Sequence, residues 1–186
     1  PSLSATQSFS VVVQEVNAAP VLSPISDVSV NELTTLVITN RANDPDLPAN
    51  TLTFSLVSAP EGVQLDSTSG VLTWTPTEAQ GPGSYPIAVM VRDNGSPSLT
   101  DTQSFNVTVK ESNQAPVLNA PQDISMNELT TLLLTLQASD SDVPANKLTF
   151  SVISAPSGLQ LDPTTGVLSW TSSEAQGPGN YSITVA

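Results

Sequence analysis

The side chains in this sequence that are best suited to chemistry are carboxylates and amides, and they recur in a fixed pattern. Asp44-Pro45-Asp46 is followed by Asn50, and the same arrangement returns 96 residues later as Asp140-Ser141-Asp142 and Asn146. Carboxylates are ligands for hard cations, and pairs of them about 5–10 Å apart carry out acid and base catalysis in glycosidases. Residues of these types also shape turns. Because the acids recur on predicted turns in each copy, a duplicated catalytic site is the weakest interpretation, and we predict that the chain is not an enzyme.

Composition removes several other kinds of site. The 186 residues contain no histidine and no cysteine, which excludes Ser-His-Asp and Cys-His catalysis, ordinary zinc sites and disulfides within this sequence. Seventeen acidic residues against four basic ones give a net charge of −13, which repels nucleic acid and anionic lipid. No apolar run approaches about 18 residues, so no membrane-spanning segment is predicted. Metal cations or basic surfaces of other proteins suit this charge better.

An internal repeat organises the chain. The block from Asn17 to Leu22 returns from Asn113 to Leu118, again at an offset of 96 residues. The beginning of the chain follows the same pattern, because Pro1 to Phe9 resembles Pro97 to Phe105. We therefore predict three segments: the last strand of a truncated upstream repeat at 1–16, a complete repeat at 17–112, and a second repeat that lacks its final strand or strands at 113–186.

The local patterns within the complete repeat favour strands. Four stretches alternate apolar with polar residues, which is typical of antiparallel strands with one buried face: 36–38, 52–56, 85–91 and 105–109. About seven short strands in about 100 residues, separated by Asp, Pro and Gly turns, predict an immunoglobulin-like sandwich. Trp74 and Trp170 each follow a Gly-Val-Leu stretch that points the indole inward. Core packing is the prediction, and an exposed indole that stacks on a sugar ring is the alternative.

These residues resemble a known group of repeats. Val30-Asn31-Glu32, Ala42 to Asp46 with Asn50, and Val91 to Pro97 stand in an order and spacing similar to those of cadherin repeats. The resemblance is closer still to the cadherin-like, dystroglycan-type and putative-Ig repeats of large bacterial cell-surface proteins. It implies an all-β chain of tandem immunoglobulin-like (cadherin-like) Greek-key β-sandwiches that binds Ca²⁺ and lies outside the cell.

The resemblance also implies a set of calcium ligands, since Ca²⁺ takes six to eight oxygen ligands and cadherins supply them at the junctions between repeats. The junction inside this chain would use Glu32, Glu78, Glu111, Asn113, Asp140, Asp142 and Asn146. An upstream junction, incomplete here, would use Glu15, Asn17, Asp44, Asp46, Asn50 and Asp93. Several carboxylates that converge on one junction repel one another unless a cation lies between them.

Two departures from the cadherin pattern reduce the expected metal content. The linker from Glu111 to Pro116 has Gln114 and Ala115 where the family places further ligands, and the acidic mid-repeat motif is reduced to Glu78. We therefore expect one ion rather than three at the junction, with a Kd of roughly 10⁻⁴–10⁻³ M.

The sequence as a whole predicts a calcium-stiffened structural or adhesive repeat module in a large cell-surface or secreted protein. Its expected partners are calcium ions, neighbouring repeats of the same chain, and homophilic or other protein contacts. A carbohydrate-binding β-sandwich attached to a secreted enzyme is the alternative, although an aromatic content of 4% argues against it. We also expect strand donation between molecules, because residues 1–16 match a strand that the second repeat lacks.

Overall fold

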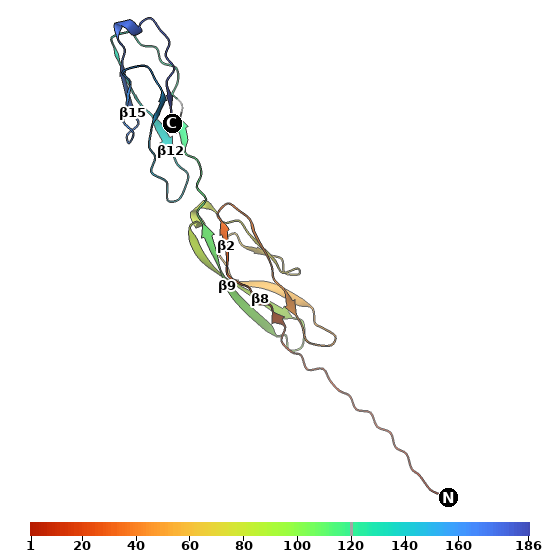
Figure 1. Ribbon diagram of the computed structural model, residues 1–186. Helices are drawn as coiled ribbons and strands as arrows, with labels where there is room; N and C mark the ends of the chain where they lie inside the picture. Colours follow the sequence, from red (N-terminus) through yellow and green to blue (C-terminus); the bar gives the residue numbers. More distant parts are fainter. Residues whose placement is uncertain (120) are drawn as a thin grey trace. The chain divides into compact units, whose positions relative to one another are not determined.

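A computed structural model describes residues 1–119 and 121–186 of the chain. The chain forms two compact units, residues 1–110 and 111–186 (Figure 1). Their regular structure consists of strands together with two short 3₁₀ helices, η1 (Glu78–Gln80) and η2 (Glu174–Gln176). The all-β fold predicted from the alternating pattern is therefore confirmed.

The first unit is a sandwich of two main sheets. One sheet has the order β2 (Val28–Asn31), β9 (Thr100–Lys110), β8 (Gly83–Asp93) and β5 (Leu52–Ser58). The other has the order β3 (Leu36–Thr39), β7 (Val71–Trp74) and β6 (Gln64–Leu65), and a short pair joins β1 (Val21–Leu22) to β4 (Ala42–Asn43). Strand β2 runs parallel to β9, whereas β8 is antiparallel to both β9 and β5.

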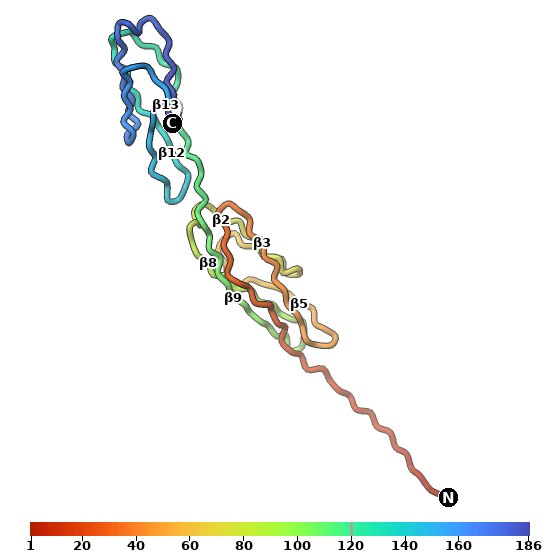
Figure 2. Tube along the Cα trace, in the orientation of Figure 1, coloured from red at the N-terminus to blue at the C-terminus, as the bar shows by residue number. Residues whose placement is uncertain are grey.

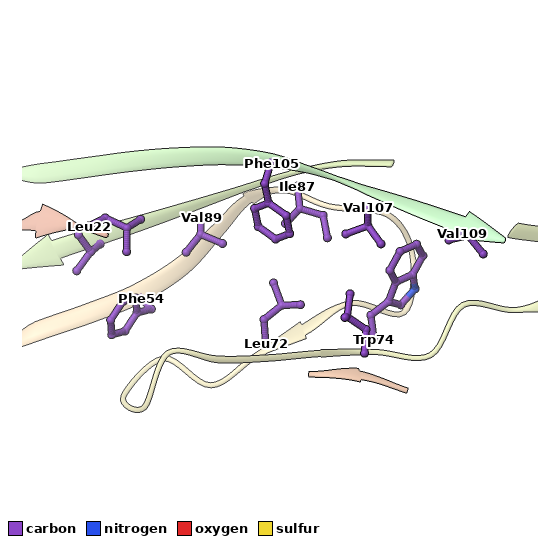
Figure 3. Close-up of a cluster of buried hydrophobic side chains, with 11 residues drawn as sticks. Leu22, Phe54, Leu72, Trp74, Ile87, Val89, Phe105, Val107 and Val109 are labelled. Atoms are coloured by element: carbon purple, nitrogen blue, oxygen red, sulfur yellow. The ribbon is translucent and has the colours of Figure 1, made fainter. Parts of the chain in front are cut away.

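The core of the first unit lies between these sheets (Figure 3). The alternating residues of the predicted strands supply it, and the strongly buried members are Leu22, Leu36, Phe54, Leu72, Trp74, Ile87, Val89, Val91, Phe105, Val107 and Val109. Trp74 is only 1% exposed, and its indole N–H donates to the Glu61 carbonyl oxygen at 3.2 Å. Tyr85 packs edge-on against the indole, with 5.3 Å between ring centroids. The prediction that this tryptophan belongs to the core is confirmed.

The long β8–β9 ladder separates the two ends of the first unit. Its register pairs Gly83 with Val109 at one end and Arg92 with Thr100 at the other. An antiparallel strand rises about 3.4 Å per residue, so the residues beyond the two ends of β8 lie on the order of 30 Å apart. Side chains that follow Asp93 therefore belong to one end of the sandwich, and those that precede Gly83 to the opposite end.

The second unit repeats the first with fewer paired strands. Its strands are β10 (Val117–Asn119), β11 (Thr131–Thr135), β12 (Gln137–Ser139), β13 (Val152–Ser154), β14 (Gln160–Leu161), β15 (Val167–Thr171) and β16 (Thr184–Val185). They pair as β10-β12, β11-β15-β14 and β13-β16. Trp170 is 6% exposed and stacks edge-on with Tyr181, so it repeats the environment of Trp74.

The first twenty residues lie in none of the strands that the structure describes, and the chain begins as an extended trace at the red end of Figure 2. The apolar side chains of residues 1–16 are exposed, among them Leu3, Phe9, Val11 and Val13. The interpretation of residues 1–16 as the last strand of another repeat stays a prediction, as do the repeat boundaries at 16/17 and 112/113. No helix in the described residues has the length and apolar character needed to cross a membrane.

Candidate metal centres

The N-terminal end of the first unit gathers polar side chains from three places in the sequence. We call this set the N-terminal group, and its members are Asn17, Asp44, Asp46, Asn50 and Asp93. Asp44 and Asp46 follow β4, whereas Asp93 is the last residue of β8. The three carboxylates are buried, with exposed fractions of 8%, 7% and 3% in that order. Burial of three acids in one place is costly unless each is hydrogen-bonded or bound to a cation.

Asp44 shapes the turn with one carboxylate oxygen, while its other carboxylate oxygen accepts no hydrogen bond from the described residues. Its Oδ1 accepts hydrogen bonds from the backbone N–H groups of Asp46 at 3.1 Å and Asn50 at 3.0 Å. Its Oδ2 is buried and accepts no hydrogen bond from any residue in the described part of the chain. A buried carboxylate oxygen without a donor loses its hydration and gains nothing in return. A cation is the partner that this oxygen fits.

The two amides of the group link its carboxylates. The Asn50 side chain donates to Asn17 Oδ1 at 2.6 Å and to Asp46 Oδ2 at 2.9 Å. The Asn17 side chain in turn donates to Asp93 Oδ2 at 3.0 Å. Burial opposes ionisation of Asp93, but hydrogen bonds from Leu99, Asn17 and Gly95 outweigh it and hold the pKa of this carboxyl below its ordinary value. The group therefore holds its carboxylate and amide oxygens in a fixed arrangement.

The second unit contains a matching set, which we call the linker group: Asn113, Asp140, Asp142 and Asn146. Asp140 Oδ1 accepts from the backbone N–H groups of Asp142 at 3.0 Å and Asn146 at 3.2 Å. The Asn146 side chain donates to Asp142 Oδ2 at 2.8 Å and to Asn113 Oδ1. Asp142 is 3% exposed. The hydrogen bonds among Asp44, Asp46 and Asn50, and the one that Asn17 Oδ1 accepts, are thus repeated 96 residues further along.

Glu32 and Glu78 at the opposite end of the first unit, together with Glu111, form a set of three glutamates that we call the glutamate group. One carboxylate oxygen from each lies within 4.8 Å of the others. Glu32 follows β2 and is fully buried, Glu78 begins η1, and Glu111 directly follows the last residue of β9. At an effective dielectric constant of about 20, two unit charges at this distance repel by roughly 3 kcal/mol. A divalent cation would replace that repulsion with attraction.

The donor sets suit one class of metal. Every side-chain donor in the three groups is a carboxylate or amide oxygen, which is the chemistry of Ca²⁺ rather than of zinc or copper. The predicted residues therefore fall into three groups, whereas Glu15 lies on the exposed segment that precedes Asn17. The assignment of these residues to two shared junctions stays a prediction.

Comparison with known proteins gives the family. The family model described as "Putative Ig domain" matches residues 19–110 and again residues 115–186. The chain belongs to this family. The two matched stretches correspond to the two copies of the repeat found in the sequence.

Curated relatives include long cadherins. Human Protocadherin-16 is 35% identical over 136 residues, which make up 68% of this chain and 4% of that protein. Mouse Cadherin-23 is 31% identical over 161 residues, 77% of this chain and 5% of the relative. Chitinase A of Pseudoalteromonas piscicida is 31% identical over 137 residues, 73% of this chain and 16% of the relative. The chain thus spans a small part of each.

Solved cadherin structures share the fold. Human CDH23 EC21-23 superposes with a TM-score of 0.56 at 22% identity, covering 90% of this chain and 62% of that one. Mouse Cadherin-23 EC22-24 gives a TM-score of 0.55 at 22% identity, covering 91% and 65%. The chain is therefore a cadherin-like, immunoglobulin-like tandem β-sandwich, as the sequence resemblance implied.

Two glycines support the candidate sites and were missed from sequence. A Cβ added at Gly95 would lie 1.6 Å from Asn17 Oδ1, and one at Gly81 would lie 1.8 Å from Glu32 Oε2. Each glycine therefore lets a ligand side chain lie against the backbone. The repeated Glu-Ala-Gln-Gly-Pro-Gly block was the available signal for Gly81. The same block and offset identify Glu128 and Glu174 as counterparts of Glu32 and Glu78, which the predicted ligand set also omitted.

Proposed function

We propose that this chain is a calcium-stiffened structural or adhesive module of a large extracellular protein. Its membership of a cadherin-like, immunoglobulin-like repeat family supports the class of function. The finer part of the proposal, that Ca²⁺ occupies the candidate sites and stiffens the chain, rests on their chemistry. Location at the cell surface follows from the same class of repeat and belongs to the proposal.

The observation that carries the proposal is Asp44 Oδ2, a buried carboxylate oxygen with no hydrogen-bond donor among the described residues. It belongs to a carboxyl group whose other oxygen is already fixed by two backbone N–H groups. The buried carboxyls of Asp46 and Asp93 belong to the same hydrogen-bonded group. A bound Ca²⁺ would supply the missing partner and neutralise the group.

Chain connectivity supports the sharing of a cation across the linker. Glu111 belongs to the glutamate group, and Asn113 to the linker group, two residues further on. Two residues of fully extended chain span at most about 7 Å. The covalent linker therefore keeps the backbones of Glu111 and Asn113 close together. Because Ca²⁺ binds six to eight oxygen atoms, one ion could take ligands from both sides of the linker. When bound, the ion would crosslink the two repeats.

Such a crosslink would change the mechanics of the chain. A linker between sandwiches behaves as a hinge unless contacts or ligands restrain it. Glu32 is held by its burial, and its backbone N–H donates to the Lys110 carbonyl oxygen at 3.0 Å. Asp142 is held by the N–H of Gln114 and the side chain of Asn146. Ligands fixed in this way on each repeat would transmit the restraint of the ion to both sandwiches.

Calcium titration of the 186-residue chain tests the proposal. With a Kd of about 10⁻⁴–10⁻³ M, 10 mM CaCl₂ should stabilise the folded chain by roughly 1.4–2.7 kcal/mol. That corresponds to a rise of about 6–20 °C in the melting midpoint of a domain of this size. Asp44→Asn keeps Oδ1 for the turn and removes the charge, so it should lose most of the calcium effect at the N-terminal group.

Glu61→Gln is the matched control, because it removes one negative charge from an exposed turn outside the three groups. It should keep the calcium response of the parent chain. Small-angle scattering with and without chelator measures the stiffening itself. Equal melting midpoints and superimposable scattering curves in calcium and in chelator would show that Ca²⁺ does not stiffen this chain.

A carbohydrate-binding or enzymatic role has less support. The exposed tryptophan that the carbohydrate alternative requires is absent at both candidate positions, since Trp74 and Trp170 are 1% and 6% exposed. The similarity to Chitinase A covers 16% of that protein and fits a repeat shared as an accessory module. Asp44 Oδ1 and both oxygens of Asp46 already accept hydrogen bonds in and beside the N-terminal group.

A further inference from the structure

The outer side of the β3-β7-β6 sheet in the first unit carries no charge. Its side chains alternate with the buried core residues Leu36, Leu72 and Trp74, so they point away from the core. We call this surface the threonine face, and its members are Thr35, Val37, Thr39, Gln64, Val71, Thr73 and Thr75. None of them is ionisable, in a chain whose net charge is −13.

The second unit repeats the threonine face on β11, β15 and β14. The counterparts at the offset of 96 are Thr131, Leu133, Thr135, Gln160, Val167, Ser169 and Thr171. Five of the seven positions keep the same residue, and the other two change only from Val to Leu and from Thr to Ser. The hydrogen bond between the hydroxyls of Thr35 and Thr75, at 2.8 Å, also returns between Thr131 and Thr171 at 2.9 Å.

The outward positions of β8 behave differently. All four from residue 84 to residue 90 differ between the repeats, because Ser84, Pro86, Ala88 and Met90 are replaced by Asn180, Ser182, Thr184 and Ala186. The inward positions between them are identical: Tyr85, Ile87 and Val89 return as Tyr181, Ile183 and Val185. Close packing of the core explains why inward residues stay the same. The threonine face has no core against it, so a contact with another molecule is the physical reason that fits its constancy.

The threonine face of the first unit has a projection beside a depression. Val37 is 59% exposed and pairs directly with Thr73 on the neighbouring strand. Thr73 also lines a depression of about 230 Å³, together with Thr35, Gly62, Gln64, Trp74 and Thr75. The depression has room for the small isopropyl group of a valine. A face that carries both a projection and a depression that accepts it is complementary to itself.

We propose that the threonine face binds the threonine face of a second copy of this chain. A two-fold axis through the contact places Val37 of each copy against the depression of the other, so the contact is isologous. Charge favours this face over others, because the seventeen acidic side chains of the chain repel those of a second copy wherever they meet. The threonine hydroxyls both donate and accept hydrogen bonds, so they can pair across the contact.

The size of the face sets the strength of the contact. Three strands about 4.8 Å apart, each with five residues that rise about 3.4 Å, cover roughly 240 Å². A stable interface of standard size buries about 800 Å² on each partner, so one pair of faces binds weakly. Each repeat presents one face, and contacts on successive repeats add through multivalency. The proposal rests on the adhesive part of the proposed function, but it uses none of the candidate calcium ligands.

Sedimentation equilibrium of the 186-residue chain up to millimolar concentration tests the contact. We expect reversible self-association in chelator and in calcium alike. Val37→Asp combined with Leu133→Asp places a charge on both faces and should weaken the association at least about tenfold, because burial of an unpaired charge is costly. The melting midpoint of each variant shows that it remains folded.

Val57→Asp combined with Ile153→Asp is the matched control. These side chains lie on β5 and β13, outside the threonine face, and are 58% and 67% exposed. Val37 and Leu133 are exposed to nearly the same extent, 59% and 70%. The control therefore adds the same charge at equally exposed positions, and it should associate like the parent chain.

Mixed cysteine variants test the orientation of the two copies. The chain has no cysteine, so chains with Val37→Cys can be mixed with isotopically labelled chains with Gln64→Cys. Oxidation should link the two kinds of chain, because Val37 of one copy lies against the depression that Gln64 lines in the other. A mixture of Val57→Cys chains with labelled Gln64→Cys chains should crosslink far more slowly.

Three results would overturn the proposal: a parent chain that stays monomeric at millimolar concentration, equal association of the two aspartate variants, or equal crosslinking of the two cysteine mixtures. A chain that associates through this face but is not stabilised by calcium would refute the calcium part of the proposed function and support this contact. A chain that is stabilised by calcium but stays monomeric would refute this contact alone.

Discussion

Replacement of Gly81 by alanine probes the glutamate group from the backbone side. The new Cβ would lie 1.8 Å from Glu32 Oε2, 2.8 Å from its Cδ and 3.1 Å from its Cβ. Gly81 has a φ of −108°, which any residue adopts, so the effect of the substitution comes from this overlap alone. Glu32 is fully buried, so its carboxylate must move within the packed end of the sandwich.

The size of the effect follows from these distances. Nonbonded contacts below about 3 Å are strongly repulsive, so the Glu32 oxygen must retreat by more than about 1 Å. Overpacking of this kind costs about 1–3 kcal/mol, which lowers the melting midpoint of a domain of this size by roughly 5–20 °C. Calcium ligands lie within a window of only about 0.3 Å, so the calcium-induced rise in the midpoint should also be largely lost.

Trp74 fluorescence during thermal unfolding, in a Trp170→Phe background, reports the first unit alone. Gly177→Ala is the matched control, followed through Trp170 in a Trp74→Phe background. Its Cβ would lie 1.9 Å from Glu128 Oε2 and 2.9 Å from the Glu128 Cβ, but Glu128 is exposed, so its carboxylate turns into solvent and the variant should lose less stability than Gly81→Ala. The reasoning fails if Gly81→Ala melts like the parent and keeps its full calcium response, or if both glycine variants lose equal stability.

Two further predictions concern the turns of the first unit. Hydrogen bonds from the backbone N–H and hydroxyl of Ser69 and the N–H of Thr68 lower the pKa of Asp66 from its ordinary value of 3.8. The contribution of ionised Asp66 to stability is therefore complete above that value and is lost as the pH falls through the lowered pKa of the folded state. Urea unfolding below about pH 4 should show a smaller loss of stability for Asp66→Asn than for the parent chain. An unchanged dependence of stability on pH would refute the assignment. Leu33 has a φ of 58° and is 54% exposed, so Leu33→Asn should raise the free energy of unfolding by up to about 1 kcal/mol, and a destabilised variant would contradict the strain argument.

The sequence alone was enough to predict the repeat, the strands and most of the acidic residues that make up the candidate metal centres. Alternation at positions such as Phe105, Val107 and Val109 reports burial directly, because successive side chains of a strand point to opposite faces. The inward prediction for Trp74 succeeded for the same reason. The Asp44-Pro45-Asp46 turn was also visible in sequence, since its hydrogen bonds reach residues only two to six positions away.

The tertiary structure decided which of these residues meet. Asn17 reaches Asp93 across 76 positions, and Gly81 lies against Glu32 across 49 positions (81 − 32), because β9 lies between β2 and β8 and fixes both ends of the sheet. Strand register over such separations depends on the packing of the whole core, which local patterns do not encode. Only the folded chain shows that Asp44 keeps one buried oxygen without a hydrogen-bond donor among the described residues.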